Sequence, residues 1–418
     1  MQSEVGILVG FFVLAASLGL GKPVWFALLV ASLSMGLIGG GLPGLSSILY
    51  STTMSSTAID LVVVTFLIAV FVNLYRASGF LAKLGEELVK ALKKPKAIAT
   101  LVPAIMGLLP VAGGALMSAP VVDGVGNHLG LSKKLKLFIN VWFRHVIFLV
   151  YPLSTTLITT ASLAGVSMWE LVLRQTPIVV SMVAIGYAVS FRNSHKQYNH
   201  NTGDPNASLL MYVFSPMLVA IFLAVAVSPL LDRQLIPFVP LTRYSMVLGL
   251  GLAIALLVKL AGKSLRDIVE AIISRTTFEL VTAAFSAILL RDAFLALGGP
   301  DIISGLMPQG DKATELVLLS LTPFVLSLAT GSPLTGSVVA ISIFKPILSV
   351  GPGEASLIYT SNMLGYLASP AHLCYVYSAQ YFEQPLTSTY REMLIGVTAT
   401  LVVAVSLYFL SNGFLWVF

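Results

Sequence analysis

Apolar stretches long enough to cross a bilayer, roughly 20 residues each, recur along the whole chain. Of its 418 residues, 57% are hydrophobic and only 10% are charged, whereas soluble domains carry roughly 25% charged residues. An all-α polytopic membrane protein therefore follows, with no room for a separate soluble domain. We predict ten crossings at about 5–20, 23–40, 58–76, 134–163, 168–191, 208–228, 243–260, 276–297, 354–382 and 388–412.

Two further apolar regions, at about 97–130 and 315–350, are interrupted midway by glycine and proline. The interruptions read Leu109-Pro110-Val111-Ala112-Gly113-Gly114 and Ala329-Thr330-Gly331-Ser332-Pro333. Each half looks too short to cross, and irregular backbone inside a membrane must be sheltered by protein or face a water-filled cavity. We predict two re-entrant hairpins; a pair of ordinary helices joined by a surface loop is the alternative.

Internal similarity indicates a duplicated unit. Asp60-Leu61-Val62, Phe66 and Gly79 reappear with the same spacing as Glu279-Leu280-Val281, Phe285 and Gly298. The separation of Gly113 from Pro152 also equals that of Gly331 from Pro370, and the offset between these two pairs is almost the same as in the first set. We predict repeat 1 over 1–191, a cytoplasmic linker at 192–207 and repeat 2 over 208–418. Five spans, one hairpin and one broken helix in each repeat make the second repeat inverted, because five is odd.

The distribution of basic residues orients this topology. The net charge is +6, but the basic side chains lie in short loops between apolar segments, where the positive-inside effect explains them. Placing both termini outside puts 17 of the 24 Lys and Arg residues on the cytoplasmic side. We therefore expect a multi-pass protein of the cell (plasma or inner) membrane, with the lipid bilayer as its environment and no nucleic-acid partner.

The spans at 134–163 and 354–382 each contain a proline among polar residues. Proline removes a backbone hydrogen bond and disfavours helix in the residue before it. A helix broken in this way exposes backbone N–H or carbonyl groups that can bind an ion without a charged side chain. A proline kink rescued by Ser and Thr is the alternative.

Arg144 lies within the first of these spans, well beyond the cytoplasmic loop. An arginine at the centre of a membrane helix costs roughly 2.5–3.5 kcal/mol on insertion scales. Its guanidinium can bind a carboxylate or phosphate in a bidentate manner, through two hydrogen bonds, which favours an anionic substrate. A structural pair with an acidic side chain such as Asp123, or snorkelling, is the alternative.

Two residues are candidates for a coupling ion. His145 is the only histidine on its span, and imidazole titrates near neutral pH; a structural histidine is the alternative. Asp292 lies near the end of the span at 276–297. No deeply buried acidic pair stands out, which weakens a pure cation/proton antiporter because such exchange usually works through carboxylates.

Other chemistry finds little support in the sequence. The single Cys374 cannot form an internal disulfide, and no Cys/His spacing resembles a zinc site. Signatures of a nucleophile elbow, a phosphate-binding loop and a metal-binding histidine pair are missing. We expect no enzyme, no metal and no cofactor beyond Na⁺ or H⁺ as coupling ion. An intramembrane enzyme or lipid-handling protein would need a catalytic dyad or a lateral opening.

The two-fold layout, with tips at Gly113-Gly114 and Thr330-Gly331-Ser332-Pro333, resembles the ion-transporter superfamily. Leu109-Pro110-Val111 leading to Ala119-Pro120-Val121 is similar to the first hairpin of gluconate permeases, and more closely to an uncharacterised family of archaeal and bacterial membrane proteins. The resemblance implies an elevator mechanism, in which hairpins and broken spans move against a scaffold that often forms a homodimer. It also implies organic anions as substrates, coupled to sodium or protons.

The resemblance also implies a substrate site at the tips and breaks. The predicted substrate-binding residues are Gly113, Gly114, Ser118, Arg144, Ser154, Thr155, Thr330, Gly331, Ser332, Thr335, Asn362, Ser369 and His372. The sequence departs from the sodium-coupled dicarboxylate branch, because Gly113-Gly114-Ala115 lacks the Asn and Thr of that tip. We predict a secondary active transporter of a small organic anion, a carboxylate or sugar acid, with a cation/proton antiporter as the alternative.

Overall fold

The computed structural model describes residues 2–92, 94–108, 114–192, 204–227, 244–304 and 312–413, and within these ranges the regular structure is entirely helical. The first half contains α1 (Gln2–Gly19), α2 (Val24–Met54), α3 (Ser56–Ala77), α4 (Phe80–Ala91), α5 (Pro95–Gly107), α6 (Gly114–His128), α7 (Lys133–Val146), the 3₁₀ turn η1 (Ile147–Leu149), α8 (Thr155–Ala164) and α9 (Met168–Phe191). The predicted all-α fold is confirmed for the described residues.

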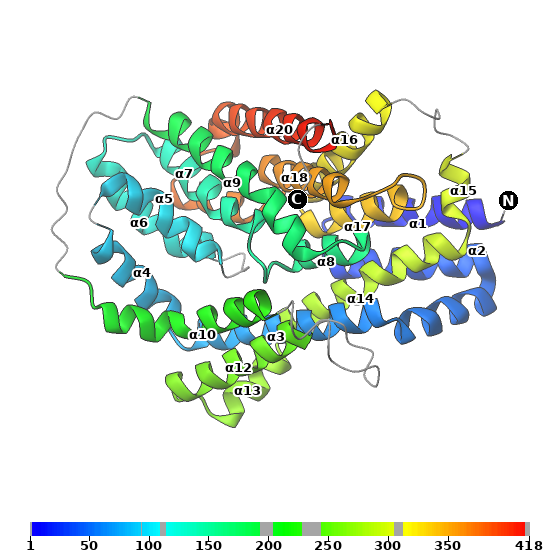
Figure 1. The fold of residues 1–418 in the computed structure, drawn as a ribbon, viewed down its shortest axis with the longest axis horizontal. Helices are drawn as coiled ribbons and strands as arrows, with labels where there is room; N and C mark the ends of the chain where they lie inside the picture. Colours follow the sequence, from blue (N-terminus) through cyan, green and yellow to red (C-terminus); the bar gives the residue numbers. More distant parts are fainter. Residues whose placement is uncertain are drawn as a thin grey trace.

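The second half follows a similar order of long and short helices. It contains α10 (Ala207–Ala226), α12 (Tyr244–Ala261), α13 (Leu265–Ile272), α14 (Arg275–Ala296), α15 (Gly299–Ser304), α16 (Lys312–Thr330), α17 (Pro333–Phe344), α18 (Pro352–Ala368), α19 (Leu373–Tyr381), the 3₁₀ turn η2 (Leu386–Thr389) and α20 (Tyr390–Gly413). Figure 1 shows that the blue-to-green and green-to-red halves interleave along the long axis.

Six of the described helical segments are long and apolar enough to cross a membrane: Val24–Met54, Ser56–Ala77, Met168–Phe191, Tyr244–Ala261, Lys312–Thr330 and Leu386–Leu410. The segments Gln2–Ser17 and Ala207–Leu223, which we also predicted as spans, are apolar but shorter. The chain thus has a multi-pass membrane fold. The count of ten crossings stays a prediction.

Both interrupted apolar regions consist of two helical arms that pack together. Helix α5 packs against α6, and α16 packs against α17. One premise of the prediction was wrong, because α16 has 19 residues and is by itself long enough to cross. It reaches this length because Pro323 lies inside the helix without ending it. The second arm, α17, has only 12 residues.

Both proline-containing spans are broken as predicted. The chain leaves α7, makes η1 and starts α8 only at Thr155, while α18 ends at Ala368 and α19 starts at Leu373. Contacts then cross between the halves, because α17 packs against α8 and α6 packs against α19. Each hairpin therefore contacts the second segment of the other half's broken helix.

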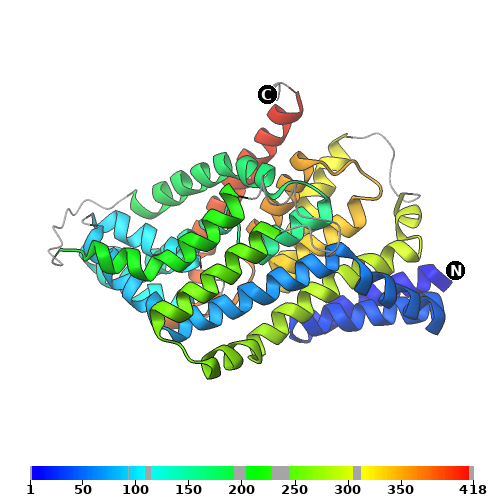
Figure 2. The same cartoon turned by 60° about the horizontal axis from the view of Figure 1, so that its bottom comes forward.

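The remaining long helices form a second layer that also joins the halves. Helix α2 packs against α1 and α14, and α3 packs against α12 and α14. Figure 2 shows α14 running beside α2 and α3, and α1 running beside α2. The predicted end of the second span at residue 40 falls at a kink in α2, because Gly41 has a positive φ of 64°. A second helical segment, which contains Pro43, continues from the kink to Met54.

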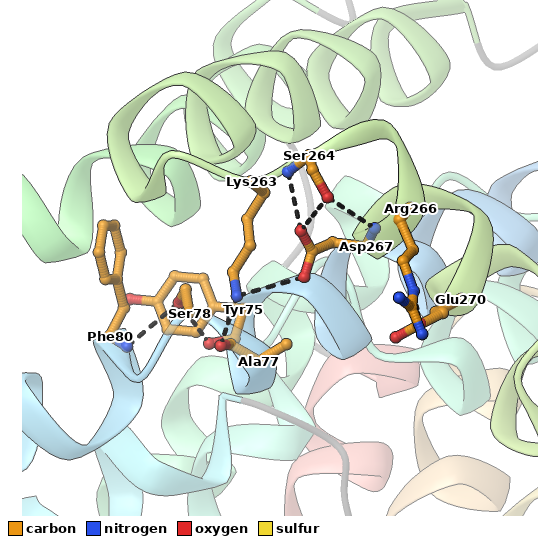
Figure 3. Close-up of polar contacts among 9 residues, drawn as sticks. All are labelled: Tyr75, Ala77, Ser78, Phe80, Lys263, Ser264, Arg266, Asp267 and Glu270. Carbon is orange, nitrogen blue, oxygen red and sulfur yellow. Dashed lines mark hydrogen bonds and ion pairs between the residues drawn. The ribbon is translucent and has the colours of Figure 1, made fainter.

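The junction between α3 and α13 shows how this layer is tied together (Figure 3). Lys263 Nζ donates to the Ala77 carbonyl oxygen at 2.8 Å, satisfying a group at the end of α3. The same ammonium group lies 3.6 Å from Asp267. Ser264 and Asp267 form a reciprocal capping box at the start of α13. A basic side chain and a helix cap thus link segments from the two halves of the chain.

Candidate functional site

A cavity of about 180 Å³ lies where the second hairpin tip meets both broken helices. The starts of α8 and α19 contribute two short runs to its wall, and the hairpin tip contributes Gly331 and Pro333. Helices α7 and α18 and the turn η1 supply the rest. The lining residues are Arg144, Phe148, Ser154, Thr155, Thr156, Gly331, Pro333, Met363, Tyr366, Leu373 and Cys374.

Three helix N-termini meet at this cavity, those of α8, α17 and α19. Ser154 caps α8 by accepting a hydrogen bond from the Leu157 N–H, and Ser332 caps α17 by accepting one from Thr335. Pro333 at the start of α17 lacks an N–H, which helix starts tolerate without loss. The first N–H groups of a helix have no partner within it and carry a partial positive charge. The wall is therefore suited to an anion.

Arg144 adds a full positive charge to the same wall. Its side chain is fully buried, and Nη1 donates to the Met106 carbonyl oxygen at 2.8 Å. Asp123, the acidic partner considered in the sequence, is instead bound by Lys136 at 2.7 Å. Close packing fixes the backbone here, because a Cβ on Gly107 would collide with the Arg144 carbonyl group. The guanidinium is thus held in the wall by α5 and α7.

Two histidines and a cysteine gather beside the cavity. His145 Nδ1 lies 2.7 Å from the Val141 carbonyl oxygen, so this nitrogen carries the proton and donates it. His145 Nε2 lies 3.1 Å from His372 Nε2, and the Tyr366 ring packs on His372 with centroids 3.9 Å apart. One donor atom from each of His145, His372 and Cys374 lies within 4.8 Å of the others.

In each broken helix, a buried asparagine forms hydrogen bonds with neighbouring helices. Asn362 Nδ2 donates to the Pro333 carbonyl oxygen at 2.6 Å and to Ser337 Oγ at 2.7 Å, and its Oδ1 accepts from Ser327. Thr160 of α8 lies 2.9 Å from the same Ser337 hydroxyl. The second hairpin, α18 and the first half's α8 are therefore joined in one hydrogen-bonded network.

Asn140 makes a similar set of contacts in the first half. Its Nδ2 donates to the Ala115 carbonyl oxygen at 3.0 Å and to Ser378 Oγ at 2.8 Å, and its Oδ1 accepts from Ser118 Oγ at 2.7 Å. Ala115 and Pro333 are separated along the chain by the same offset as Gly113 and Gly331, and so are Thr160 and Ser378. These two pairs of network residues thus stand at the offset found in the sequence, whereas the asparagines do not, because the offset pairs Asn362 with Arg144.

The structure brings many predicted site residues together. Arg144, Ser154, Thr155 and Gly331 line the cavity. His372 is the residue just before α19, where its side chain makes no capping hydrogen bond. Thr330, Ser332, Thr335 and Ser369 stand at the tip and the break, where their hydroxyls bond mainly to nearby backbone and to one another. Gly113 lies outside the described residues, and Gly114 begins α6. Asn362 and Ser118 belong to the asparagine networks. Their roles in binding stay predictions.

Asp292 lies apart from this cluster. It accepts a hydrogen bond from Thr52 Oγ1 at 2.9 Å and pairs with Arg291, on the face of α14 that packs against α2. It does not line the cavity. Among the two coupling-ion candidates, only His145 lies beside the wall.

Sequence reasoning missed several wall residues, chiefly Thr156, Tyr366, Leu373 and Cys374. The offset between the two halves could have found two of them. It pairs Ser154-Thr155-Thr156 with His372-Leu373-Cys374, the segments that begin α8 and α19. The second segment carries no hydroxyl, so its composition alone gave no sign of a binding surface.

The described helices, with the pairs α5–α6 and α16–α17 and the breaks after α7 and α18, form an all-helical membrane fold. The structure is similar to one titled "Crystal structure of the Alcanivorax borkumensis YdaH transporter reveals an unusual topology", with a TM-score of 0.60, 14% identity, and coverage of 89% of this chain and 90% of that chain. Residues 5–410 match the family described as "Protein of unknown function (DUF401)", and the chain belongs to that family. No curated protein sequence matches it.

Proposed function

We propose that the protein is a secondary active transporter of a small organic anion, such as a carboxylate or sugar acid. The observation that carries this proposal is the cavity shared by three helix N-termini and Arg144. Helix N-termini and a guanidinium attract negative charge. None of the cavity's described lining residues is Asp or Glu, so the wall offers no carboxylate to a cation.

The size of the cavity favours a small substrate. At about 180 Å³ it is smaller than the pockets that hold drug-sized ligands, which run from roughly 300 to 1,000 Å³. Phe148, Met363 and Tyr366 supply apolar and aromatic surface beside the polar groups. A short acid with one charged end and an apolar or hydroxylated body meets both requirements.

The helix order supports an architecture of two inverted repeats, 1–191 and 208–418, joined by the linker 192–207. The reciprocal contacts α6 with α19 and α17 with α8 are what such a repeat would produce. We propose that hairpins and broken helices form a moving domain. Helices α1, α2, α3, α10, α12, α13 and α14 would form a scaffold that dimerises, and both termini would lie on the outer side of the cell membrane. Na⁺ or H⁺ would drive the movement.

Ligand-dependent stability of the purified protein tests the substrate class. A ligand that binds only the folded state at 100 times its Kd adds about 2.7 kcal/mol of stability. We expect one class among carboxylates, sugar acids and phosphates to raise the melting temperature, and Arg144→Gln to abolish the rise. Arg266→Gln is the matched control, because the Arg266 side chain is 88% exposed on α13. A panel without effect, or an effect preserved in Arg144→Gln, would overturn the proposal.

Uptake by proteoliposomes then tests the coupling. The stabilising anion should accumulate only under an inward gradient of Na⁺ or of protons, and the gradient that works identifies the ion. Exchange of Na⁺ for protons without anion movement would instead favour the cation/proton antiporter.

A further inference from the structure

His145, His372 and Cys374 form a cluster beside the cavity, and Cys374 also lines its wall. All three residues are at least 95% buried, and their donor atoms lie within 4.8 Å of one another. His145 comes from the end of α7, whereas the other two begin α19 in the opposite half of the chain. Two imidazoles and a thiol are donors typical of transition-metal sites.

The orientation of His145 suits a metal ligand. Because Nδ1 donates to the Val141 carbonyl oxygen, the lone pair of a neutral His145 is on Nε2, which points at His372. Metal-binding histidines usually have such a backbone or carboxylate partner on their other nitrogen. The separation of 3.1 Å between the two Nε2 atoms is close to that of two nitrogens bound to one ion at about 2.0 Å each.

The second nitrogen of His372, Nδ1, points away from His145. It is buried, and the Leu367 backbone lies near it. In the tautomer with the proton on Nδ1, a neutral His372 turns the lone pair of Nε2 toward His145. The Tyr366 ring against one face of His372 holds the imidazole in place, so the ring cannot readily turn toward another partner.

We propose that His145, His372 and Cys374 bind a monovalent thiophilic ion, Cu⁺, with Cys374 as a thiolate. Thiolate ligands favour Cu⁺, Zn²⁺ and iron–sulfur clusters, and imidazole suits both copper and zinc. Charge decides between Cu⁺ and Zn²⁺, because Cu⁺ and one thiolate sum to zero, whereas a divalent ion would leave an extra positive charge beside the buried Arg144 guanidinium. Binding releases the thiol proton to water, and no oxidation or reduction is involved.

The test uses the full-length purified protein under anaerobic, reducing conditions, titrated with Cu⁺ against a chromophoric Cu⁺ chelator. We expect one Cu⁺ per chain, and Cys374→Ser and His145→Gln should each weaken binding at least a hundredfold. His128→Gln is the control, since His128 is an exposed histidine at the end of α6. Unchanged affinity in Cys374→Ser would overturn the proposal, as would wild-type protein that does not compete with the chelator.

A second measurement does not depend on the variants folding. Cys374 is the only cysteine of the chain, so the rate of maleimide labelling reports on this thiol alone. Equimolar Cu⁺ should slow labelling of the wild-type protein at least tenfold, and Na⁺ should not. Protection by Zn²⁺ but not by Cu⁺ would overturn the choice of ion. Neither readout involves anion transport, so failure here leaves the proposed function untouched.

Discussion

At the scale of single residues, Asn362 connects three helices, α16, α17 and α18, through its side-chain amide. Its partners are the Pro333 carbonyl oxygen and the hydroxyls of Ser327 and Ser337. Asn362→Leu keeps the branched arrangement of side-chain heavy atoms but leaves these buried groups short of a partner, each at a cost of about 1–3 kcal/mol. We expect the free energy of unfolding to fall by more than about 2 kcal/mol, measured by denaturation of the detergent-solubilised protein.

Asn140→Leu should cost about as much, because Asn140 makes the same number of contacts in the first half. Gln384→Leu is the control, since the side-chain amide of Gln384 bonds only to the exposed Glu383 carbonyl group among the hydrogen bonds of the described residues. A loss in Asn362→Leu no greater than in the control would contradict the role of the network.

Asp267 gives a prediction for pH dependence. Hydrogen bonds from the Ser264 side chain and backbone, with Lys263 nearby, hold the pKa of Asp267 below its ordinary value. A depressed carboxyl pKa stabilises the folded protein above the unfolded pKa, about 3.9, and this stabilisation is lost as the pH falls through the folded value. Asp267→Asn should therefore melt at a modestly lower temperature at pH 7, and the difference should shrink below about pH 4. A difference that grows on acidification would contradict this account.

At the scale of elements, the contact between α16 and α18 depends on a missing side chain. A Cβ on Gly365 would collide with the Phe324 carbonyl group, whose carbon would be only 2.8 Å away. Backbone cannot move aside as a flexible side chain can, so Gly365→Ala must push the hairpin away from the broken helix. We expect destabilisation of about 1–3 kcal/mol, the usual cost of overpacking, in a thermal melt.

Gly251→Ala on α12 is the matched control for this contact. Nothing lies within 4 Å of a Cβ built at Gly251, and alanine favours helix over glycine by about 1 kcal/mol. This variant should be as stable as the wild type or slightly more so. Equal responses of both variants would mean that the α16–α18 contact contributes little.

At the element scale, glycine and proline in the sequence predicted where some helices end, but not the length of every helix. The interruptions at Gly331 and Pro370 were visible because glycine and proline change the backbone directly, and both fall where helices end. The length of α16 was underestimated, because the apolar region was predicted to start at about 315 whereas the helix begins at Lys312. The helical segment that follows the kink at Gly41 in α2 was not predicted.

At the scale of the whole molecule, the two halves depend on each other. Contacts of α2 with α14, α3 with α12 and α8 with α17 all join the first half of the chain to the second. We expect 1–192 and 204–418, expressed as separate chains in one cell, to assemble and copurify, and each half alone to be degraded. Copurification is measured with a tag on one half only. Accumulation of either half alone as a stable, monodisperse protein would contradict this interdependence.

The sequence by itself determined the membrane environment, the all-α class, the places where helices break and the offset between the halves. These properties depend on local chemistry, since apolar length, proline and glycine act on their own segment of chain. Only the tertiary structure decided that Tyr366 and Cys374 share a wall with Arg144 and that His145 faces His372 from the opposite half of the chain. Such contacts arise because helices from opposite halves pack together, and no pattern within one helix records which side chain of a distant helix it will meet.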